Sequence, residues 1–185
     1  MDFENELIPG VLIKRYKRFF VDIKLKNKTV TAHCPNPGSM IKLLDKGNPV
    51  WITKSKNKER KLKYTLQIIE VDNIKICVNT HVTNKIVQES IDKGVIKELK
   101  SFKIIRPEKK FGKDTRFDFF LYNNKTDKKA FLEVKSVSLQ RKTKHAEFPD
   151  SVTSRGKKHL ENLISAYEQG YESYLIFLIQ IEKCK

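Results

Sequence analysis

Short apolar runs separated by turn signals fill roughly the first eighty residues, a pattern typical of strands. The turn signal at residues 35–38 is Pro-Asn-Pro-Gly, in which two prolines and a glycine disfavour regular pairing. The segments rich in β-branched and aromatic residues are residues 10–26, 29–33, 49–53, 61–71 and 74–79. Short strands at this density predict a small closed β-barrel of the OB type over residues 1–82.

The hydrophobic period changes at residue 83, which predicts a domain boundary. Over residues 83–93 the apolar positions recur at helical spacing, and Thr83 and Gly94 are suited to cap the two ends of a helix. The elements predicted further along are three strands, a second helix and a largely apolar strand: residues 103–106, 116–122, 130–139, 153–169 and 174–181. Residues 83–185 are therefore expected to form an α/β domain, which makes the chain α+β overall.

The charge balance indicates an anionic partner. The chain of 185 residues carries 38 Lys and Arg against 22 Asp and Glu, a formal net charge of +16. A surplus of this size favours a polyanion such as nucleic acid, and the alternative is a lysine-rich surface that is simply solvated. With 39% hydrophobic residues, the composition excludes a disordered or low-complexity protein.

Targeting and redox signals are those expected of a cytoplasmic protein. The sequence has no apolar run of about 18 residues and its first six residues are polar and acidic, so neither a membrane span nor a secretion signal is expected. Cys34, Cys77 and Cys184 are odd in number and far apart, which argues against a disulfide framework or a zinc site.

Two carboxylates and a lysine form the candidate catalytic site. Asp118 lies in an apolar strand between Phe117 and Phe119, whose side chains are expected on the opposite face. Glu133 and Lys135 share one face of the next strand, so a hairpin would bring them to Asp118. Buried carboxylates are costly unless a cation lies between them, and Mg²⁺ or Mn²⁺ takes one or two carboxylates together with waters and a substrate phosphate. Lys135 would then orient or help deprotonate an attacking water.

A simpler interpretation of these residues is a salt bridge between Lys135 and either carboxylate on a solvated sheet face. The surroundings favour the metal site, because the charged positions lie within apolar strands and basic residues cluster at the start of the last predicted helix. Basic groups near a helix N-terminus typically hold backbone phosphates. The nucleic-acid-binding candidates in this half of the chain are Arg116, Arg155, Lys158 and His159.

A second basic cluster lies near the N-terminus, where cations alternate with Tyr16 and Phe19. On the face of an OB barrel such residues pair with phosphates and stack on bases. The alternative is that the two rings belong to the barrel core and the cations are only solvated. The candidate cations are Lys14, Arg15, Lys17 and Arg18.

The spacing of Asp118 and the Glu133-Val134-Lys135 triplet resembles the core of the PD-(D/E)xK nuclease superfamily. That resemblance implies that a carboxylate on the preceding helix is an occasional extra metal ligand, and Glu89 matches by position. Longer blocks resemble the sugar fermentation stimulation protein family, SfsA: residues 7–10, 15–19, 32–40, 60–65, 78–80, 116–119, 133–137 and 148–160. This resemblance implies an N-terminal OB-like barrel, a C-terminal PD-(D/E)xK-like domain, DNA binding and a link to the expression of sugar-utilisation genes.

Members of that family usually continue beyond Ile181 through another helix and strand, which leaves open that the sequence lacks its C-terminal end. The function expected from the sequence is that of a DNA-binding protein with a Mg²⁺- or Mn²⁺-dependent phosphodiesterase site. The alternative is a DNA-binding regulator without catalysis, and RNA is a second candidate partner. No membrane partner is expected.

Overall fold

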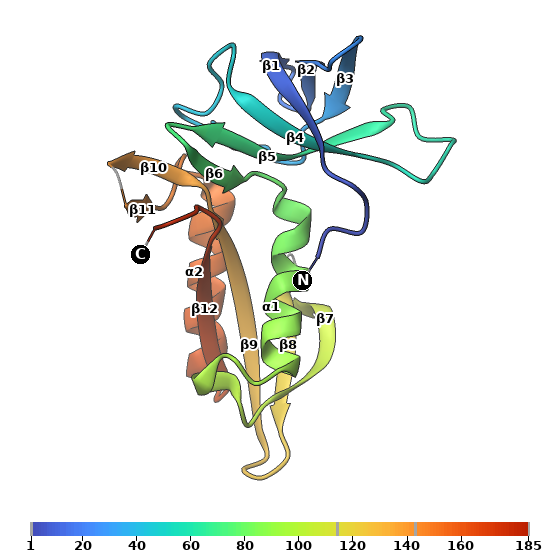
Figure 1. Cartoon of the computed structure of the whole chain (residues 1–185). Helices are drawn as coiled ribbons and strands as arrows, with labels where there is room; N and C mark the ends of the chain where they lie inside the picture. Colours follow the sequence, from blue (N-terminus) through green and yellow to red (C-terminus); the bar gives the residue numbers. More distant parts are fainter. Residues whose placement is uncertain (1, 114, 143, 185) are drawn as a thin grey trace. The chain divides into compact units, whose positions relative to one another are not determined.

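The computed structural model describes residues 2–113, 115–142 and 144–184. The chain forms two compact units (Figure 1). The barrel unit contains the described residues of stretches 1–81, 136–151 and 179–185, and the sheet unit contains those of stretches 82–135 and 152–178. No helix among the described residues is long and apolar enough to cross a membrane.

Six strands in the order β3-β2-β1-β4-β5-β6 form the sheet of the barrel unit. A parallel pairing of β3 with β5 closes the first five strands into a barrel, which confirms the predicted OB-type fold. The strands are β1 (Ile8–Tyr16), β2 (Phe20–Lys24), β3 (Thr29–His33), β4 (Pro49–Lys54), β5 (Tyr64–Val71) and β6 (Ile74–Cys77). A hairpin that was not predicted, β10 (Leu139–Lys142) with β11 (His145–Glu147), also belongs to this unit.

The predicted single strand over residues 10–26 is wrong, because the chain turns back between β1 and β2. Lys17 and Arg18 form this turn with φ values of 46° and 61°. Two successive left-handed residues match the twist of a tight hairpin, and the usual Asn-Gly signal for such a turn is missing from the sequence. Two of the cations expected on a strand therefore lie in a turn.

The sheet unit is built on four strands in the order β12-β9-β8-β7. Helix α1 and helix α2 pack on its two faces. Alternate residues of β9 show the layering, because Leu132 and Val134 pack with Val87 of α1 whereas Phe131 packs with Leu163 of α2. This arrangement is the mixed α/β fold expected of the second half of the chain. Its elements are α1 (Thr83–Asp92), β7 (Lys103–Phe111), β8 (Thr115–Asn123), β9 (Lys128–Val137), α2 (Ser154–Glu168) and β12 (Glu172–Ile179).

The ends of the two helices follow local capping rules. Helix α1 begins at Thr83 itself, with Val82 at the N-cap, so the expectation that Thr83 is the cap is wrong. Gly94 ends the helix as predicted, with φ of 64° and a bond from the Val95 N–H back to the Ser90 carbonyl. Helix α2 is capped by the Thr153 hydroxyl, which accepts a 3.0 Å bond from the Gly156 N–H.

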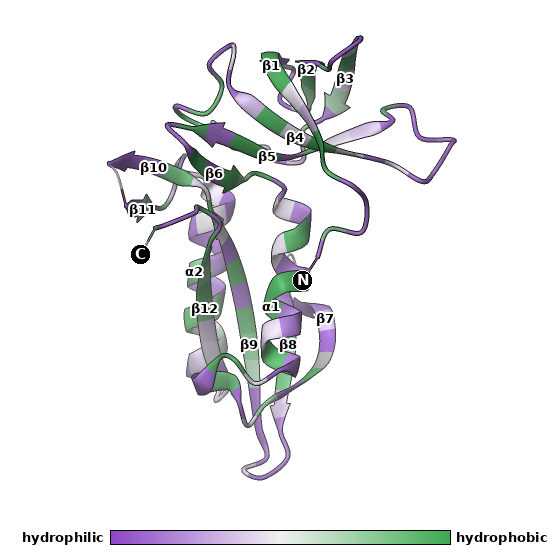
Figure 2. Cartoon of the chain, in the orientation of Figure 1, coloured by the Kyte–Doolittle hydropathy of each residue, from purple (hydrophilic) through white to green (hydrophobic). Residues whose placement is uncertain are grey.

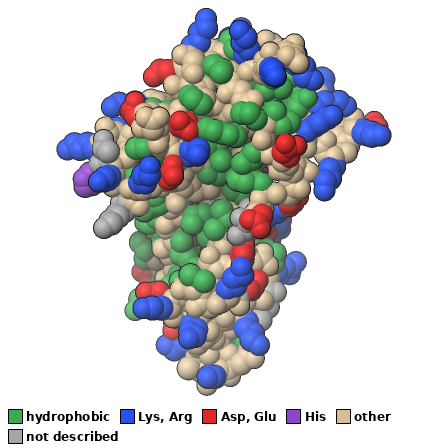
Figure 3. All heavy atoms as spheres, viewed as in Figure 1, with side chains coloured by type: hydrophobic (Ala, Val, Ile, Leu, Met, Phe, Trp, Pro, Cys, Tyr) green, Lys and Arg blue, Asp and Glu red, His purple; other side chains and the backbone are tan. Residues whose placement is uncertain are grey.

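Both helices are amphipathic, with green and purple stretches alternating along them in Figure 2. Figure 3 shows how the surplus positive charge is distributed on one face, where blue Lys and Arg side chains stand around the loops of the barrel strands and at the turn between β8 and β9. Lys and Arg side chains on this face are thus exposed to solvent, where they are available to an anionic ligand.

Candidate functional site

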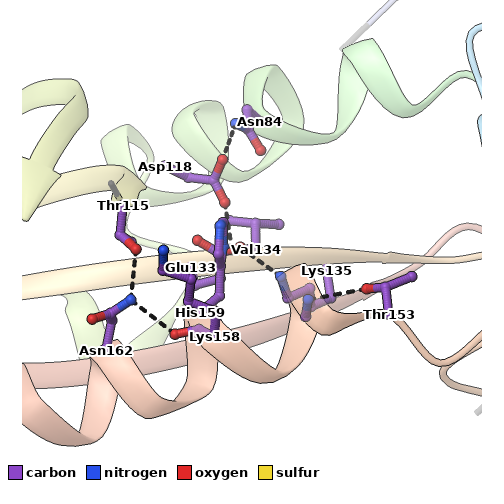
Figure 4. A network of polar contacts seen from close by, with 11 residues as sticks. Asn84, Thr115, Asp118, Glu133, Val134, Lys135, Thr153, Lys158, His159 and Asn162 are labelled. Carbon is purple, nitrogen blue, oxygen red and sulfur yellow. Dashed lines mark hydrogen bonds and ion pairs between the residues drawn. The ribbon is translucent and has the colours of Figure 1, made fainter. Parts of the chain in front are cut away.

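Asp118 is held where the β8–β9 hairpin opens. The two strands pair from Asn123–Lys128 to Phe119–Leu132. Beyond this point the Asp118 Oδ2 atom accepts a 2.7 Å bond from the Val134 N–H, and its Oδ1 atom accepts a 2.7 Å bond from Asn84 Nδ2 of α1. Figure 4 shows Asp118 between the strand that carries Glu133 and the helix that carries Asn84. The carboxylate is thus fixed in place by one backbone and one side-chain donor.

Glu133 is buried, with 4% of its surface exposed. Its Oε1 atom accepts a 2.5 Å bond from Lys135 Nζ and lies 2.6 Å from His159 Nδ1 of helix α2. An ionised carboxylate can only accept, so this contact is a hydrogen bond when His159 has its proton on Nδ1. The second oxygen, Oε2, is buried and has no hydrogen-bond partner among the described residues. A buried anionic oxygen without a donor is costly, which leaves a position suited to a cation.

The two carboxylates influence each other electrostatically. The pKa of Asp118 is raised above its usual value, first by burial and then by the negative charge of Glu133. The hydrogen bonds from Val134 and Asn84 oppose this shift without cancelling it. A divalent cation near the two carboxylates would favour their ionised forms and so oppose this shift.

The expected placement of Phe117 and Phe119 on one shared face is wrong. Phe117 packs with Phe131 on the α2 side of the sheet, with ring centroids 5.1 Å apart, whereas Phe119 belongs to the core on the α1 side. The regular alternation of β8 fails next to Asp118, whose side chain takes the Val134 N–H. The irregularity lets Asp118 point toward α1 while it stays beside β9.

A basic pocket of about 580 Å³ lies beside Glu133 in the sheet unit. It is lined by all four residues predicted to bind nucleic acid in this half of the chain: Arg116, Arg155, Lys158 and His159. Lys110 and Lys113 add further positive charge to the lining of the pocket. Glu108 contributes a carboxylate to the same lining. His159 differs from the other three predicted residues because it is buried and bonded to Glu133, so it joins the pocket to the carboxylate pair.

The structure does not bring Glu89 to the carboxylate pair. Glu89 forms an ion pair with Lys93 at 2.5 Å, and the α1 side chain bonded to Asp118 is Asn84. Among the described residues, no group of three or more Asp, Glu, His or Cys side chains is placed to hold a metal ion. Asn84 was missed because an Asn in the first turn of a helix carries no signal of its own in the sequence.

The N-terminal basic cluster has a different organisation from the one expected. Arg15 points its guanidinium at three backbone carbonyls, those of Arg18 and Asn36 at 2.8 Å and that of Gly38 at 2.9 Å. Arg15 therefore stabilises the local backbone, in addition to the predicted role in binding nucleic acid. Lys17 and Arg18 are exposed.

Tyr16 and Phe19 are 36% and 44% exposed, so the alternative that both rings belong to the barrel core is wrong. Lys14 lies over the Tyr16 ring at 5.4 Å and 3.9 Å from Asp22. Proteins that bind single-stranded nucleic acid use this arrangement, because the bases stack on exposed rings while neighbouring cations contact the phosphates.

Comparison with known proteins adds the family context. The sugar fermentation stimulation protein RE domain model matches residues 81–185, and the SfsA N-terminal OB domain model matches residues 13–78. A sugar fermentation stimulation protein homolog from Pelagibacter ubique (strain HTCC1062) is 53% identical over 98% of this chain and 78% of its own length. The homolog from Marinomonas sp. (strain MWYL1) is 45% identical over 96% of this chain and 69% of its own length.

A solved structure has the same fold over the whole chain. The structure of Pyrococcus furiosus SfsA in complex with Ca²⁺ superimposes with a TM-score of 0.89 and covers 100% of this chain and 77% of that one. The sequence identity in this comparison is 24%, so the likeness concerns the fold.

Proposed function

Because the chain belongs to the sugar fermentation stimulation protein family, SfsA, we propose that it is a DNA-binding phosphodiesterase that works with Mg²⁺ or Mn²⁺. The observation that carries the proposal is the Oε2 atom of Glu133, which is buried without a hydrogen-bond partner among the described residues, next along β9 to the Val134 N–H that holds Asp118. An oxygen of this kind next to a second carboxylate fits a hard divalent cation, which binds through one or two carboxylates and completes its shell with water and substrate phosphate.

The residues around this position divide the work. Asp118 and Glu133 would hold the metal ion, which when bound would polarise a phosphodiester and neutralise the charge that develops on it. Lys135, fixed by Glu133 at 2.5 Å, holds an ammonium group where an attacking water can be oriented. His159 keeps the Glu133 carboxylate in one orientation through its Nδ1–H.

The basic pocket supplies the binding side of the proposed reaction. Arg116, Arg155 and Lys158 line a space of about 580 Å³ that would hold the phosphates flanking the scissile bond. The relative from Pyrococcus furiosus is described in complex with Ca²⁺. Ca²⁺ shares the preference of Mg²⁺ for oxygen ligands, which supports a divalent-cation site within this fold.

The test compares wild type with Asp118→Asn and Lys135→Ala on DNA and RNA substrates in Mg²⁺, Mn²⁺ or EDTA. Asp118→Asn removes a negative charge while keeping shape, so metal affinity and cleavage should fall together. Lys135→Ala keeps both carboxylates, so metal should still bind while turnover falls on the order of 10²-fold.

The matched control is Asp92→Asn, which makes the same chemical change at an exposed position at the end of α1. Cleavage by this control should equal that of wild type. The proposal is wrong if wild type shows no metal-dependent cleavage of any substrate, or if Asp118→Asn cleaves as fast as Asp92→Asn.

A second candidate is a DNA-binding regulator without catalysis. It is favoured by the ion pair and hydrogen bond that Lys135 and His159 already give to Glu133, because they neutralise part of its charge without a metal ion. This candidate predicts DNA binding that is equal in Mg²⁺ and EDTA, with no cleavage in either.

A further inference from the structure

A second polar pocket, of about 340 Å³, lies on the barrel unit. It is built from segments that are far apart in the sequence: His33 at the end of β3, Arg60 in the loop between β4 and β5, and His81 after β6. These residues have no role in the proposed phosphodiesterase site. The pocket therefore requires its own explanation.

The floor of this pocket is a chain of hydrogen bonds between buried side chains. Gln67 Nε2 donates to Thr53 Oγ1 at 2.8 Å, and Gln67 Oε1 accepts from Asn79 Nδ2 at 2.7 Å. Asn79 Oδ1 in turn accepts from the His81 N–H at 3.0 Å. Each amide is thereby fixed in one orientation, so the floor is preorganised.

In this pocket, His33 has a ring nitrogen atom without a hydrogen-bond partner in the described part of the chain. Its ring lies between Phe19, at a centroid distance of 6.3 Å, and His81, at 5.9 Å. Its Nδ1 atom is buried and has no hydrogen-bond partner among the described residues. A buried ring nitrogen that forms no bond is costly, and a ligand with a hydrogen-bonding atom would satisfy it.

Positive charge gathers around the same ring. Burial lowers the pKa of His33 most, and the nearby Arg60 and His81 side chains lower it further. Arg60 donates through Nη1 to Thr65 Oγ1 at 3.0 Å, which directs its guanidinium toward a residue of the pocket lining. An anion bound among these side chains would counter the positive charge of Arg60 and accept hydrogen bonds from the imidazole rings.

The loop that carries Arg60 adds positive charge near the pocket. Figure 3 shows blue side chains around this loop of the barrel. Two carboxylates oppose an anion there, Glu59 in the loop and Glu4 in the pocket lining. They are outnumbered by the cations of residues 54–63, which are Lys54, Lys56, Lys58, Arg60, Lys61 and Lys63.

We propose that the pocket formed by His33, Arg60 and His81 binds a phosphate group carried by a nucleotide or by the end of a nucleic acid strand. A phosphate presents several acceptor oxygens, which suits the fork of Arg60 together with ring N–H donors of the histidines. The volume of about 340 Å³ accommodates a phosphate with the sugar attached to it. The site uses no residue of the carboxylate pair and needs no metal ion.

Calorimetric titration in EDTA tests the site separately from the phosphodiesterase proposal. The probes are inorganic phosphate, adenosine 5′-monophosphate against adenosine, and a short oligothymidylate with and without a 5′-phosphate. At least one phosphorylated probe should bind about tenfold or more tightly than its unphosphorylated counterpart, because charge-assisted hydrogen bonds are lost without the phosphate. Preference for the mononucleotide identifies a soluble phosphate ester, and preference for the oligonucleotide identifies a strand end.

Arg60→Gln should abolish that preference, whereas Lys61→Gln, which removes the same charge from the same loop outside the pocket lining, should change it less than twofold. His33→Gln is the second variant, and His81→Gln replaces it if circular dichroism shows a loss of folding. The site is refuted if the 5′-phosphate changes affinity less than twofold for every probe, or if Lys61→Gln costs as much affinity as Arg60→Gln.

Discussion

Glu133 organises the candidate site through a single oxygen, since Lys135 and His159 both approach its Oε1 atom. The two partners come from different elements, one from β9 itself and one from α2. Their shared contact holds the carboxylate in one rotamer and leaves Oε2 as the atom that faces no donor among the described residues. Lys135 and His159 thus position Glu133 through Oε1, whereas the other oxygen, Oε2, is the atom proposed to bind the metal ion.

Arg15 offers a test at the same scale, because its guanidinium is bonded to three backbone carbonyls. Arg15→Gln should lower the free energy of unfolding by about 1–3 kcal/mol, since several hydrogen bonds are lost at once. The control Lys17→Gln removes the same charge from the adjacent exposed turn and should stay within about 0.5 kcal/mol of wild type. Urea unfolding followed by circular dichroism measures both. Equal stability of the two variants would contradict a structural role for Arg15.

The roles of individual residues were only partly predictable. The period of two in β9 correctly placed Glu133 and Lys135 on one face, because the pleat is a local property of any strand. The contacts of Asn84 with Asp118 and of His159 with Glu133 depend on how α1 and α2 pack on the sheet. That register is a tertiary property, and single-sequence periodicity does not contain it.

At the scale of elements, strong local signals gave accurate predictions. Strand β3 spans Thr29–His33 as predicted, and helix α2 spans Ser154–Glu168 against a prediction of residues 153–169. The β10–β11 hairpin was missed because its two strands are short and largely polar, with no alternating pattern of hydrophobic residues. The β1–β2 turn was missed because Lys and Arg occupy left-handed positions that usually carry Asn or Gly.

The cap of α2 links an element to the candidate site, because the first turn of this helix carries Arg155 and Lys158. Thr153→Ala should cost about 1 kcal/mol of stability by removing the acceptor of the Gly156 N–H. Thr153→Ser keeps a hydroxyl at this position and should retain most of that energy. Thermal unfolding of the two variants measures the difference, and equal destabilisation by Ala and Ser would show that the cap is unimportant.

At the scale of the whole molecule, the net charge of +16 sets how binding should respond to salt. Each phosphate that the protein neutralises releases condensed counterions, so the logarithm of the DNA association constant should fall linearly with the logarithm of salt concentration. The steepness of that line counts the contacts. A binding curve that does not change with salt would exclude the phosphate backbone as the main ligand.

Variants can then assign the contacts to one unit or the other. Removing Lys17 and Arg18 together by Gln substitution tests the barrel turn, and removing Arg155 and Lys158 tests the basic pocket of the sheet unit. Each lost phosphate contact should reduce the slope by about 1, so a double substitution in the unit that binds DNA should reduce it by about 2. Fluorescence anisotropy over a salt series in EDTA gives the slopes without cleavage. If the pocket is the binding surface, Arg155→Gln with Lys158→Gln flattens the line and the barrel-turn pair does not. If neither pair changes the slope, the role in nucleic-acid binding predicted for Lys17, Arg18, Arg155 and Lys158 is wrong.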